Sequence, residues 1–232
     1  MGKRIENAKK LIDVNKHYSL DDAILFFLKE YTGKFKAKFD ETIEFVLKLG
    51  IDVKQSDQMV RGVLAMPHGL GKKKKVAVIA NSEKIQEAKN AGAEEVGGED
   101  LIEKIKGGFL DFDACLATPA MMAKIATIAK ILGPKGLMPN PKLGTVSENI
   151  SGAVKNIKSG QIEFRVDKNG IIHAGIAKIG FSKEKIKANI IALYEAVLGA
   201  KPAKSKGVYV LNAFLSSTHG PSLKLDLKTF IN

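Results

Sequence analysis

Two short segments of this sequence carry side chains that could bind a phosphate backbone. Segment 38–42, Lys-Phe-Asp-Glu-Thr, places a basic, an aromatic and small polar groups at the start of an alternating stretch. Segment 216–221, Ser-Ser-Thr-His-Gly-Pro, places hydroxyls, an imidazole and a glycine in a turn. Hydroxyls and backbone N–H groups can bond phosphates and 2′-hydroxyls without reading a base, and glycine permits close approach. For each segment alone, ordinary turn and strand-edge chemistry is the alternative.

A third candidate is the turn 167–170, Asp-Lys-Asn-Gly, which is typical of a hairpin connection between two strands. Arg165 and Lys168 flank this turn and could add phosphate contacts. If both ends of the chain share one domain, we expect the three segments to converge on one surface.

No combination of residues indicates catalysis or a metal site. The spacings of the four histidines match no ligand pair on a helix or turn. The glycine- and lysine-rich run 69–75 precedes a predicted strand, whereas phosphate-binding glycine loops follow a strand and open a helix. Its lysines either lie in solvent at an edge of the domain or contact a phosphate backbone. Cys115 is predicted to be a buried, inert thiol. We therefore expect no catalytic residue, no metal site and no cofactor.

The charge balance favours a polyanionic partner. The chain of 232 residues has 37 Lys plus Arg against 25 Asp plus Glu, a formal net charge of +12. Each phosphate that a cation neutralises releases counterions, which drives binding to nucleic acid. Tryptophan is absent and aromatics are few, so folded nucleic acid is favoured over single strands held by stacking. Without a membrane-length apolar run or a signal-peptide pattern, and with one cysteine, we expect a cytoplasmic protein with no membrane partner.

Two kinds of periodicity alternate along the chain. Near both ends, period-two alternation predicts half-buried strands, together with a helix from Ser19 to about Tyr31 and a helix capped by Ser182. The second helix is predicted to carry an apolar stripe of Ile186, Ile190, Leu193 and Val197 on one face. Between them, short apolar strands alternate with helices, as in a parallel α/β unit. One of these helices is predicted from Thr118 to Leu132, and the last is predicted to begin at Ser147. The predicted strands are 42–49, 59–66, 162–166, 171–178, 208–216 and 222–227 near the ends, and 76–80, 94–96 and 113–117 in the middle.

This organisation predicts two domains. Residues 1–67 and 160–232 form a discontinuous α+β domain with an antiparallel sheet, and residues 68–159 form an inserted α/β domain with a parallel sheet. The two crossings between them suggest a hinge with open and closed states.

The stretch 131–146 contains three of the seven prolines and three glycines, so it predicts a shaped loop. Leu137 and Met138 lie inside this loop, and Lys135 and Lys142 flank them. The two apolar residues either plug the loop into its own domain or form a contact surface.

The sequence resembles a known family over nearly its whole length. The specific block is Gly-Pro-Lys-Gly-Leu-Met-Pro at 133–139, and further matching segments are 38–42, 49–52, 60–62, 67–72, 160–165 and 218–221. These residues are similar to those of the large-subunit ribosomal protein L-one family in its bacterial form. The resemblance implies a discontinuous rRNA-binding domain and a central Rossmann-like domain.

Members of this family sit on the mobile stalk beside the ribosomal exit site, help to release deacylated tRNA and can repress their own mRNA. The resemblance therefore implies these partners, and a protein that is monomeric when free. Lys135 and Lys142 would face tRNA. One departure is His219, where the family commonly has methionine. Carried over residue by residue, the rRNA-binding set is Lys38, Phe39, Thr42, Arg165, Asp167, Lys168, Thr218, His219 and Gly220.

Two other functions remain as alternatives. A free regulatory RNA-binding protein of the same fold would act away from the ribosome. A nucleotide-using enzyme could be built on the central α/β unit, although the missing glycine loop argues against it.

Overall fold

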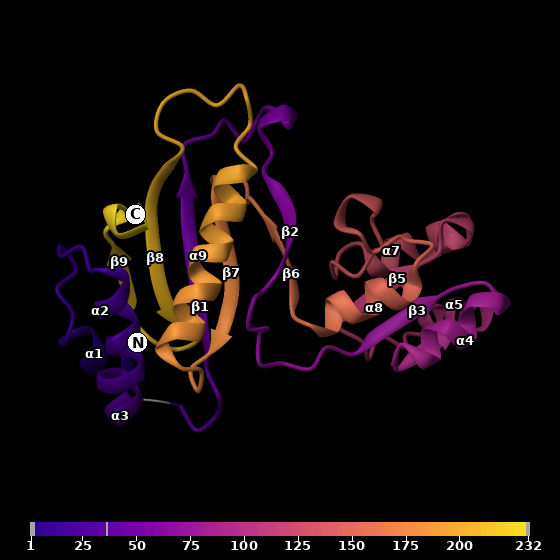
Figure 1. Ribbon diagram of the computed structural model, residues 1–232, viewed down its shortest axis with the longest axis horizontal. Helices are drawn as coiled ribbons and strands as arrows, with labels where there is room; N and C mark the ends of the chain where they lie inside the picture. The colour runs from indigo at the N-terminus through magenta and orange to yellow at the C-terminus, as the bar shows by residue number, and fades with distance from the viewer. Residues whose placement is uncertain (1–2, 36, 231–232) are drawn as a thin grey trace. The chain divides into compact units, whose positions relative to one another are not determined.

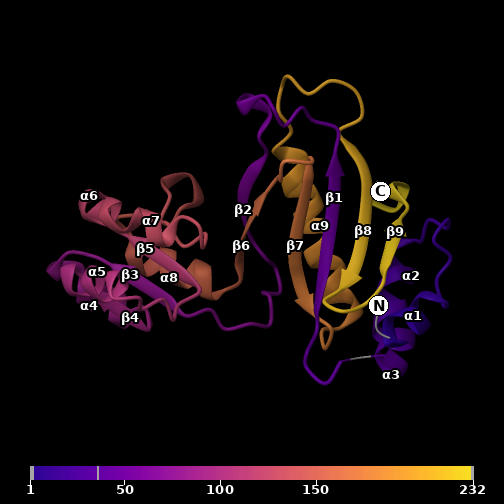
Figure 2. The same cartoon turned by 180° about the vertical axis from the view of Figure 1, so that it is seen from behind.

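The computed structural model describes residues 3–35 and 37–230, which divide into two compact units (Figures 1 and 2). The first unit contains the described residues up to Gly71 and from Ile162 onward, and the second is Lys72–Gln161. The first has an antiparallel sheet and the second a parallel one, so the predicted fold class is confirmed. That each unit is a domain able to fold by itself stays a prediction.

The first unit is built on a four-stranded antiparallel sheet of order β7-β1-β8-β9. Strand β1 lies between partners from the other end of the chain, since Phe45 is opposite both Ala174 and Leu215. Alternate side chains of β1 are buried, as its apolar periodicity predicted. The bounds are β1 Thr42–Leu49, β7 Ile171–Lys178, β8 Val210–Ser217 and β9 Ser222–Leu225.

Helix α9 (Lys183–Gly199) lies across one face of this sheet, in front of the strands in Figure 1 and behind them in Figure 2. The predicted apolar stripe of this helix is buried, which confirms that it faces the core. The stripe consists of Ile186, Ile190, Leu193 and Val197.

The N-terminal helical segment starts as predicted, because the Ser19 hydroxyl accepts a hydrogen bond from the Asp22 amide. It does not continue as one regular α-helix to Tyr31. Helix α2 (Leu20–Leu25) passes into a π-helix (Phe26–Tyr31) and then α3 (Thr32–Phe35). The wider turn of a π-helix brings residues five apart onto one face, and Phe26 and Tyr31 are both buried. A further helix, α1, spans Lys3–Lys9.

The turn after β6 (Gln161–Arg165) exists, but the hairpin ladder beside it is short. Strand β6 pairs with β2 (Arg61–Ala65) in a separate two-stranded sheet, while β7 pairs with β1. The strands on either side of the turn share the bridge Val166–Ile172. The predicted hairpin turn and return strand are therefore present, and the Asp167 amide donates to the Ile171 carbonyl at 2.8 Å, but the paired part is short because β6 and β7 continue in different sheets.

The second unit has a parallel sheet of order β4-β3-β5, covered on both faces. All four side chains of β3 (Val76–Ile79) are buried, alternately in two separate apolar clusters. Helices α4 (Ser82–Asn90) and α8 (Ile150–Lys158) contribute to one cluster, and α5 (Glu99–Lys106) contributes to the other. The remaining strands are β4 (Glu95–Gly97) and β5 (Ala114–Ala117).

The predicted helix from Thr118 to Leu132 is broken into short pieces. A 3₁₀ turn (Pro119–Met121) leads into α6 (Met122–Ile125), another 3₁₀ turn (Ala126–Ile128) and α7 (Ala129–Leu132). At the break, the Thr127 hydroxyl donates to the Lys124 carbonyl at 2.8 Å, and this kind of back-bonding bends helices. Further 3₁₀ turns span Ser56–Gln58, Pro141–Leu143 and Leu227–Phe230.

Two smaller expectations for this unit are resolved. Leu137 and Met138 pack against the apolar cluster that includes α5, so they plug the 131–146 loop into its own unit. Helix α8 begins at Ile150 and not at Ser147, because the Asn149 side chain accepts a hydrogen bond from the Gly152 amide. Within the described residues, no helix is both long and apolar enough to span a membrane.

A buried amide on α9 fixes the chain segment that leaves the first unit. Asn189 is fully buried on the apolar side of the helix. Its Nδ2 donates to the carbonyls of Gly69 at 2.9 Å and Ile176 at 2.8 Å, and its Oδ1 accepts from the His68 amide at 3.2 Å. These bonds tie α9, β7 and the 68–69 segment together.

We expect Asn189→Leu to lower the free energy of unfolding of the first unit by about 2–4 kcal/mol, because it leaves buried backbone groups without partners. All four tyrosines lie in this unit and the chain has no tryptophan, so tyrosine fluorescence in a urea titration reports its unfolding. Glu195→Leu, at an exposed position of the same helix, is the control and should change stability by less than about 0.5 kcal/mol. Equal effects of the two substitutions would contradict the role of the Asn189 bonds.

Candidate nucleic-acid interface

The two segments first singled out in the sequence meet at one corner of the antiparallel sheet. Strand β1 begins at Thr42 where β8 ends, with Ile43 opposite Ser217. The Thr42 amide donates to the Thr218 hydroxyl at 3.0 Å, and the Thr218 amide donates to the Thr42 carbonyl at 3.1 Å. Residues far apart in the chain are therefore locked side by side. We call Lys38, Phe39, Thr42, Lys178, Thr218, His219 and Gly220 the Thr218 corner.

Lys178, at the end of β7, adds a cation that the sequence reasoning missed. Its Nζ donates to the Thr42 hydroxyl at 2.9 Å and to the Asp40 carbonyl at 3.0 Å. Because the Thr42 oxygen accepts from Lys178, its own proton is free to be donated to an incoming acceptor. Lys38 is exposed nearby in the chain. The corner thus presents the Thr42 hydroxyl donor beside positive charge, a combination suited to phosphate oxygens. The Thr218 hydroxyl, in contrast, donates its proton to the Thr42 carbonyl at 3.3 Å.

An exposed aromatic pair flanks the hydroxyls. The rings of Phe39 and His219 meet edge to face, with centroids 5.6 Å apart and planes at 81°. Phe39 keeps 47% of its surface exposed. Both side chains are exposed, so their ring surfaces are available for a base or a sugar.

Gly220 is required by close packing. A Cβ at this position would lie 2.1 Å from the Ser217 hydroxyl and 3.2 Å from the Tyr31 ring. The Gly220 amide donates to the Ser217 carbonyl at 2.9 Å, which closes the turn after β8. Glycine thus lets this turn lie directly on the buried residues beneath it.

The sheet face opposite α9 continues from this corner. Glu44 is opposite Ser216, and Val46 is opposite both His173 and Phe214. None of these five side chains is buried, whereas their neighbours along each strand are. The polar half of the β1 alternation was the signal that could have identified this face. Sequence reasoning used only the apolar half.

Arg165, Asp167 and Lys168 do not join the Thr218 corner. The Leu49 amide donates to the Gly170 carbonyl at 2.8 Å, so their turn lies at the opposite end of β1. An eight-residue strand spans about 24 Å at roughly 3.4 Å per residue. The expected convergence of all three segments on one surface was therefore wrong. Each strand has two ends, and the sequence did not reveal which one the turn occupies.

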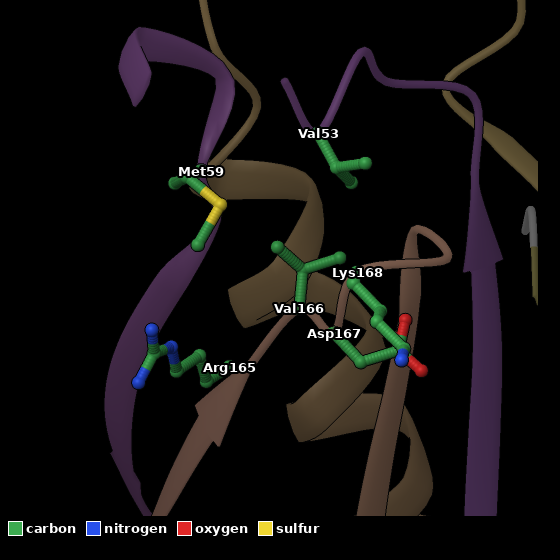
Figure 3. Close-up of a pocket in the computed structure, with 6 residues that line it drawn as sticks. All are labelled: Val53, Met59, Arg165, Val166, Asp167 and Lys168. Carbon is green, nitrogen blue, oxygen red and sulfur yellow. The ribbon is translucent and has the colours of Figure 1, made fainter. Parts of the chain in front are cut away.

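Asp167 has a structural role in its turn. Its Oδ1 accepts hydrogen bonds from the amides of Ile171 and Asn169, both at 2.8 Å. The Ile171 amide is the main cause that lowers the pKa of this carboxyl group, and the Asn169 amide adds to it. Val53 and Met59 line a pocket of about 400 Å³ beside this turn (Figure 3). In Figure 3 the exposed side chains of Arg165 and Lys168 extend away from each other.

The remaining candidates lie in the second unit. Lys135 is exposed on the 131–146 loop, and the side chain of Lys142 lies outside the described part of the structure. Two lysines of the 69–75 run are engaged in ion pairs of 2.6 Å, Lys72 with Asp113 and Lys75 with Asp111, which favours the solvated-edge interpretation.

Cys115 is buried as predicted, and burial raises the pKa of its thiol to about 12. Across residues 3–35 and 37–230, no group of three or more His, Cys, Asp or Glu side chains is placed to hold a metal ion.

Comparisons with known proteins agree with the resemblance seen in the motifs. The model of the ribosomal protein L1p/L10e family matches residues 28–221. The chain is 51% identical over 225 residues to the large ribosomal subunit protein uL1 of Bdellovibrio bacteriovorus, a match that covers 97% of this chain and 94% of that protein.

We expect Asp167→Ala to destabilise the first unit by about 1 kcal/mol at pH 7, because two amides lose their acceptor. Asp167→Asn keeps an acceptor oxygen and should lose less. The carboxyl pKa is lowered in the folded state from an ordinary value of 3.8, so its ionisation stabilises the fold above that pH. The difference between wild type and Asp167→Ala should shrink as pH falls below about 4. Urea titrations from pH 3 to pH 7 would test this, and a pH-independent difference would contradict it.

Proposed function

The chain belongs to the ribosomal protein L1p/L10e family and is a protein of the large ribosomal subunit, and from this premise we propose that the Thr218 corner binds rRNA of the mobile stalk. The observation that carries the proposal is the bonding that fixes two hydroxyls before any RNA arrives. The Thr42 amide donates to the Thr218 hydroxyl, and Lys178 donates to the Thr42 hydroxyl. Preorganised groups lose little entropy on binding, so they favour the RNA whose backbone fits their positions.

Different side chains of the Thr218 corner would make different kinds of contact with the RNA. Lys38 and Lys178 attract the phosphate backbone and contribute the salt-dependent part of the affinity. The Thr42 hydroxyl donates to a phosphate or 2′-hydroxyl oxygen, and the Thr218 hydroxyl, whose proton goes to the Thr42 carbonyl, accepts from a 2′-hydroxyl. Both oxygens have fixed positions, which favours folded RNA of one shape. Phe39 and His219 offer ring surfaces for stacking. Arg165 and Lys168 would reach only an RNA long enough to follow β1 to its other end.

The proposal extends to two further partners that the family resemblance implies. The second unit would approach deacylated tRNA in the exit site with the loop that carries Lys135, and would help to release it. The same corner would bind the leader of the protein's own mRNA and repress translation, provided that the leader copies the shape of the stalk. A Lys135→Glu variant in reconstituted ribosomes should slow the release of deacylated tRNA. In variants of the Thr218 corner, repression of the protein's own mRNA should fall in parallel with binding to the stalk rRNA.

We expect Thr218→Val to weaken binding to a stalk rRNA fragment about tenfold, equivalent to about 1.4 kcal/mol. The substitution keeps the side-chain shape but removes the hydroxyl, and it leaves the salt dependence unchanged because no charge is lost. Thr218→Ser, which keeps the hydroxyl, is the control. The competitor is a scrambled duplex of equal length. If wild type binds both RNAs equally, charge alone drives binding and the stalk proposal fails.

A separate salt titration locates the phosphate contacts. Lys38→Met should weaken binding to any RNA and reduce the salt slope by about one, because one fewer counterion is released. Lys168→Met removes the same charge at the other end of β1, so an unchanged slope there would restrict the contact to the Thr218 corner. If Lys168→Met alone lowered the slope, the contact would have been assigned to the wrong end of the sheet.

Retention of the protein on large subunits after a high-salt wash separates a ribosomal protein from a free regulatory one.

A further inference from the structure

We infer that Glu41 is a positioning residue for the Thr218 corner: it holds the segment before β1 and the turn after β8 in their RNA-binding arrangement without touching RNA itself. This inference rests on the proposed rRNA-binding function.

The carboxylate of Glu41 is buried directly beneath the corner. Glu41 precedes Thr42 in the chain and is 0% exposed. It accepts hydrogen bonds from the Ala37 amide at 2.7 Å and from the Tyr31 hydroxyl at 3.0 and 3.1 Å. A buried carboxylate is costly unless such donors surround it. Its position therefore ties the π-helix and the segment before β1 to the first residues of the strand.

Arg4 extends the same network to the turn after β8. Its Nη1 lies 3.6 Å from the Glu41 carboxylate and donates to the Phe35 carbonyl at 3.1 Å. Its Nη2 donates to the His219 carbonyl at 3.4 Å. One guanidinium thus joins the buried charge to both segments that carry the exposed aromatic pair. Helix α1 is thereby connected to the corner, and its Ala8 is buried in the core of the same unit.

Ser217, at the end of β8, is buried, and its hydroxyl has no hydrogen-bond partner among the described residues. Burial opposes the ionisation of the Glu41 carboxyl group, but the nearby Ser217 hydroxyl, the Ala37 amide and the Tyr31 hydroxyl together hold the pKa of this group below its usual value. The Tyr31 ring in turn lies 3.2 Å from where a Gly220 Cβ would be. The Glu41, Tyr31 and Ser217 side chains therefore support the 218–220 turn.

Since Glu41 is fully buried and its charge is paired with Arg4, its effect on RNA must pass through the segments that it holds. Loosening them would cost affinity, because ordering them again would then have to accompany binding.

The matched experiment uses two buried tyrosine hydroxyls of the same unit. Tyr31 bonds Glu41, whereas Tyr209 bonds the Val197 carbonyl at 3.1 Å, near the other end of β8.

We expect Glu41→Gln to weaken binding to the stalk fragment about tenfold and Tyr31→Phe about threefold, both with an unchanged salt slope. Tyr209→Phe, which removes a comparable hydroxyl, should leave binding within about a factor of 1.5 of wild type. In the free full-length protein, the His219 ring proton resonances should shift in Glu41→Gln and Tyr31→Phe but not in Tyr209→Phe. Combined with Thr218→Val, Glu41→Gln should lose less affinity than the product of the two single effects.

The possible outcomes distinguish a failure of this inference from a failure of the proposed rRNA-binding function. If wild type does not prefer the stalk fragment over a scrambled duplex, the proposed function fails first. If wild type does prefer it, but Tyr31→Phe binds as Tyr209→Phe does and leaves the His219 resonances in place, the positioning role of Glu41 is overturned. Should Glu41→Gln fail to fold, Tyr31→Phe still decides between these outcomes.

Discussion

The two-sided pairing of β1 is the constraint on which the first unit depends. This strand comes from the first fifty residues, yet both of its neighbours, β7 and β8, come from beyond residue 170. Its apolar side chains enter a core shared with α9, so a shift by one residue would turn them toward solvent. The register is therefore strongly fixed, and that register sets Thr42 beside Thr218.

A second consequence concerns the polar groups inside this core. Asn189 and Glu41 are both fully buried, and each is surrounded by hydrogen-bond partners from other segments: Asn189 bonds the distant Gly69, and Glu41 bonds Ala37 and Tyr31 of the segments before it. Such groups contribute little net stability compared with apolar packing, but a wrong arrangement would leave them unpaired. They therefore favour one arrangement of the segments around them. Asn189 does so for the segment that leaves the unit, and Glu41 for the proposed RNA-binding corner.

The accuracy of sequence interpretation varied with the range of the interaction that decides each feature. The Ser19 cap, the buried stripe of α9 and the alternation of β1 follow from local periodicity and were predicted correctly. The π-helix, with Phe26 and Tyr31 buried on one face, depends on how the chain packs, and it was missed. The break at Thr127 was also missed, although the hydrogen bond that accompanies it is local. The Asp167 turn was predicted, but the pairing of the strands around it was not, since a turn does not determine which strands its flanks join.

By itself, the sequence determined the kinds of unit, the positive charge and, through the 133–139 block and its companion motifs, the family. Only the tertiary structure decided which candidate residues share a surface. It placed Thr42 with Thr218 and moved Arg165, Asp167 and Lys168 to the far end of β1. The physical reason is that local patterns report which side chains face a core, whereas the position of a residue along a sheet is set by long-range register.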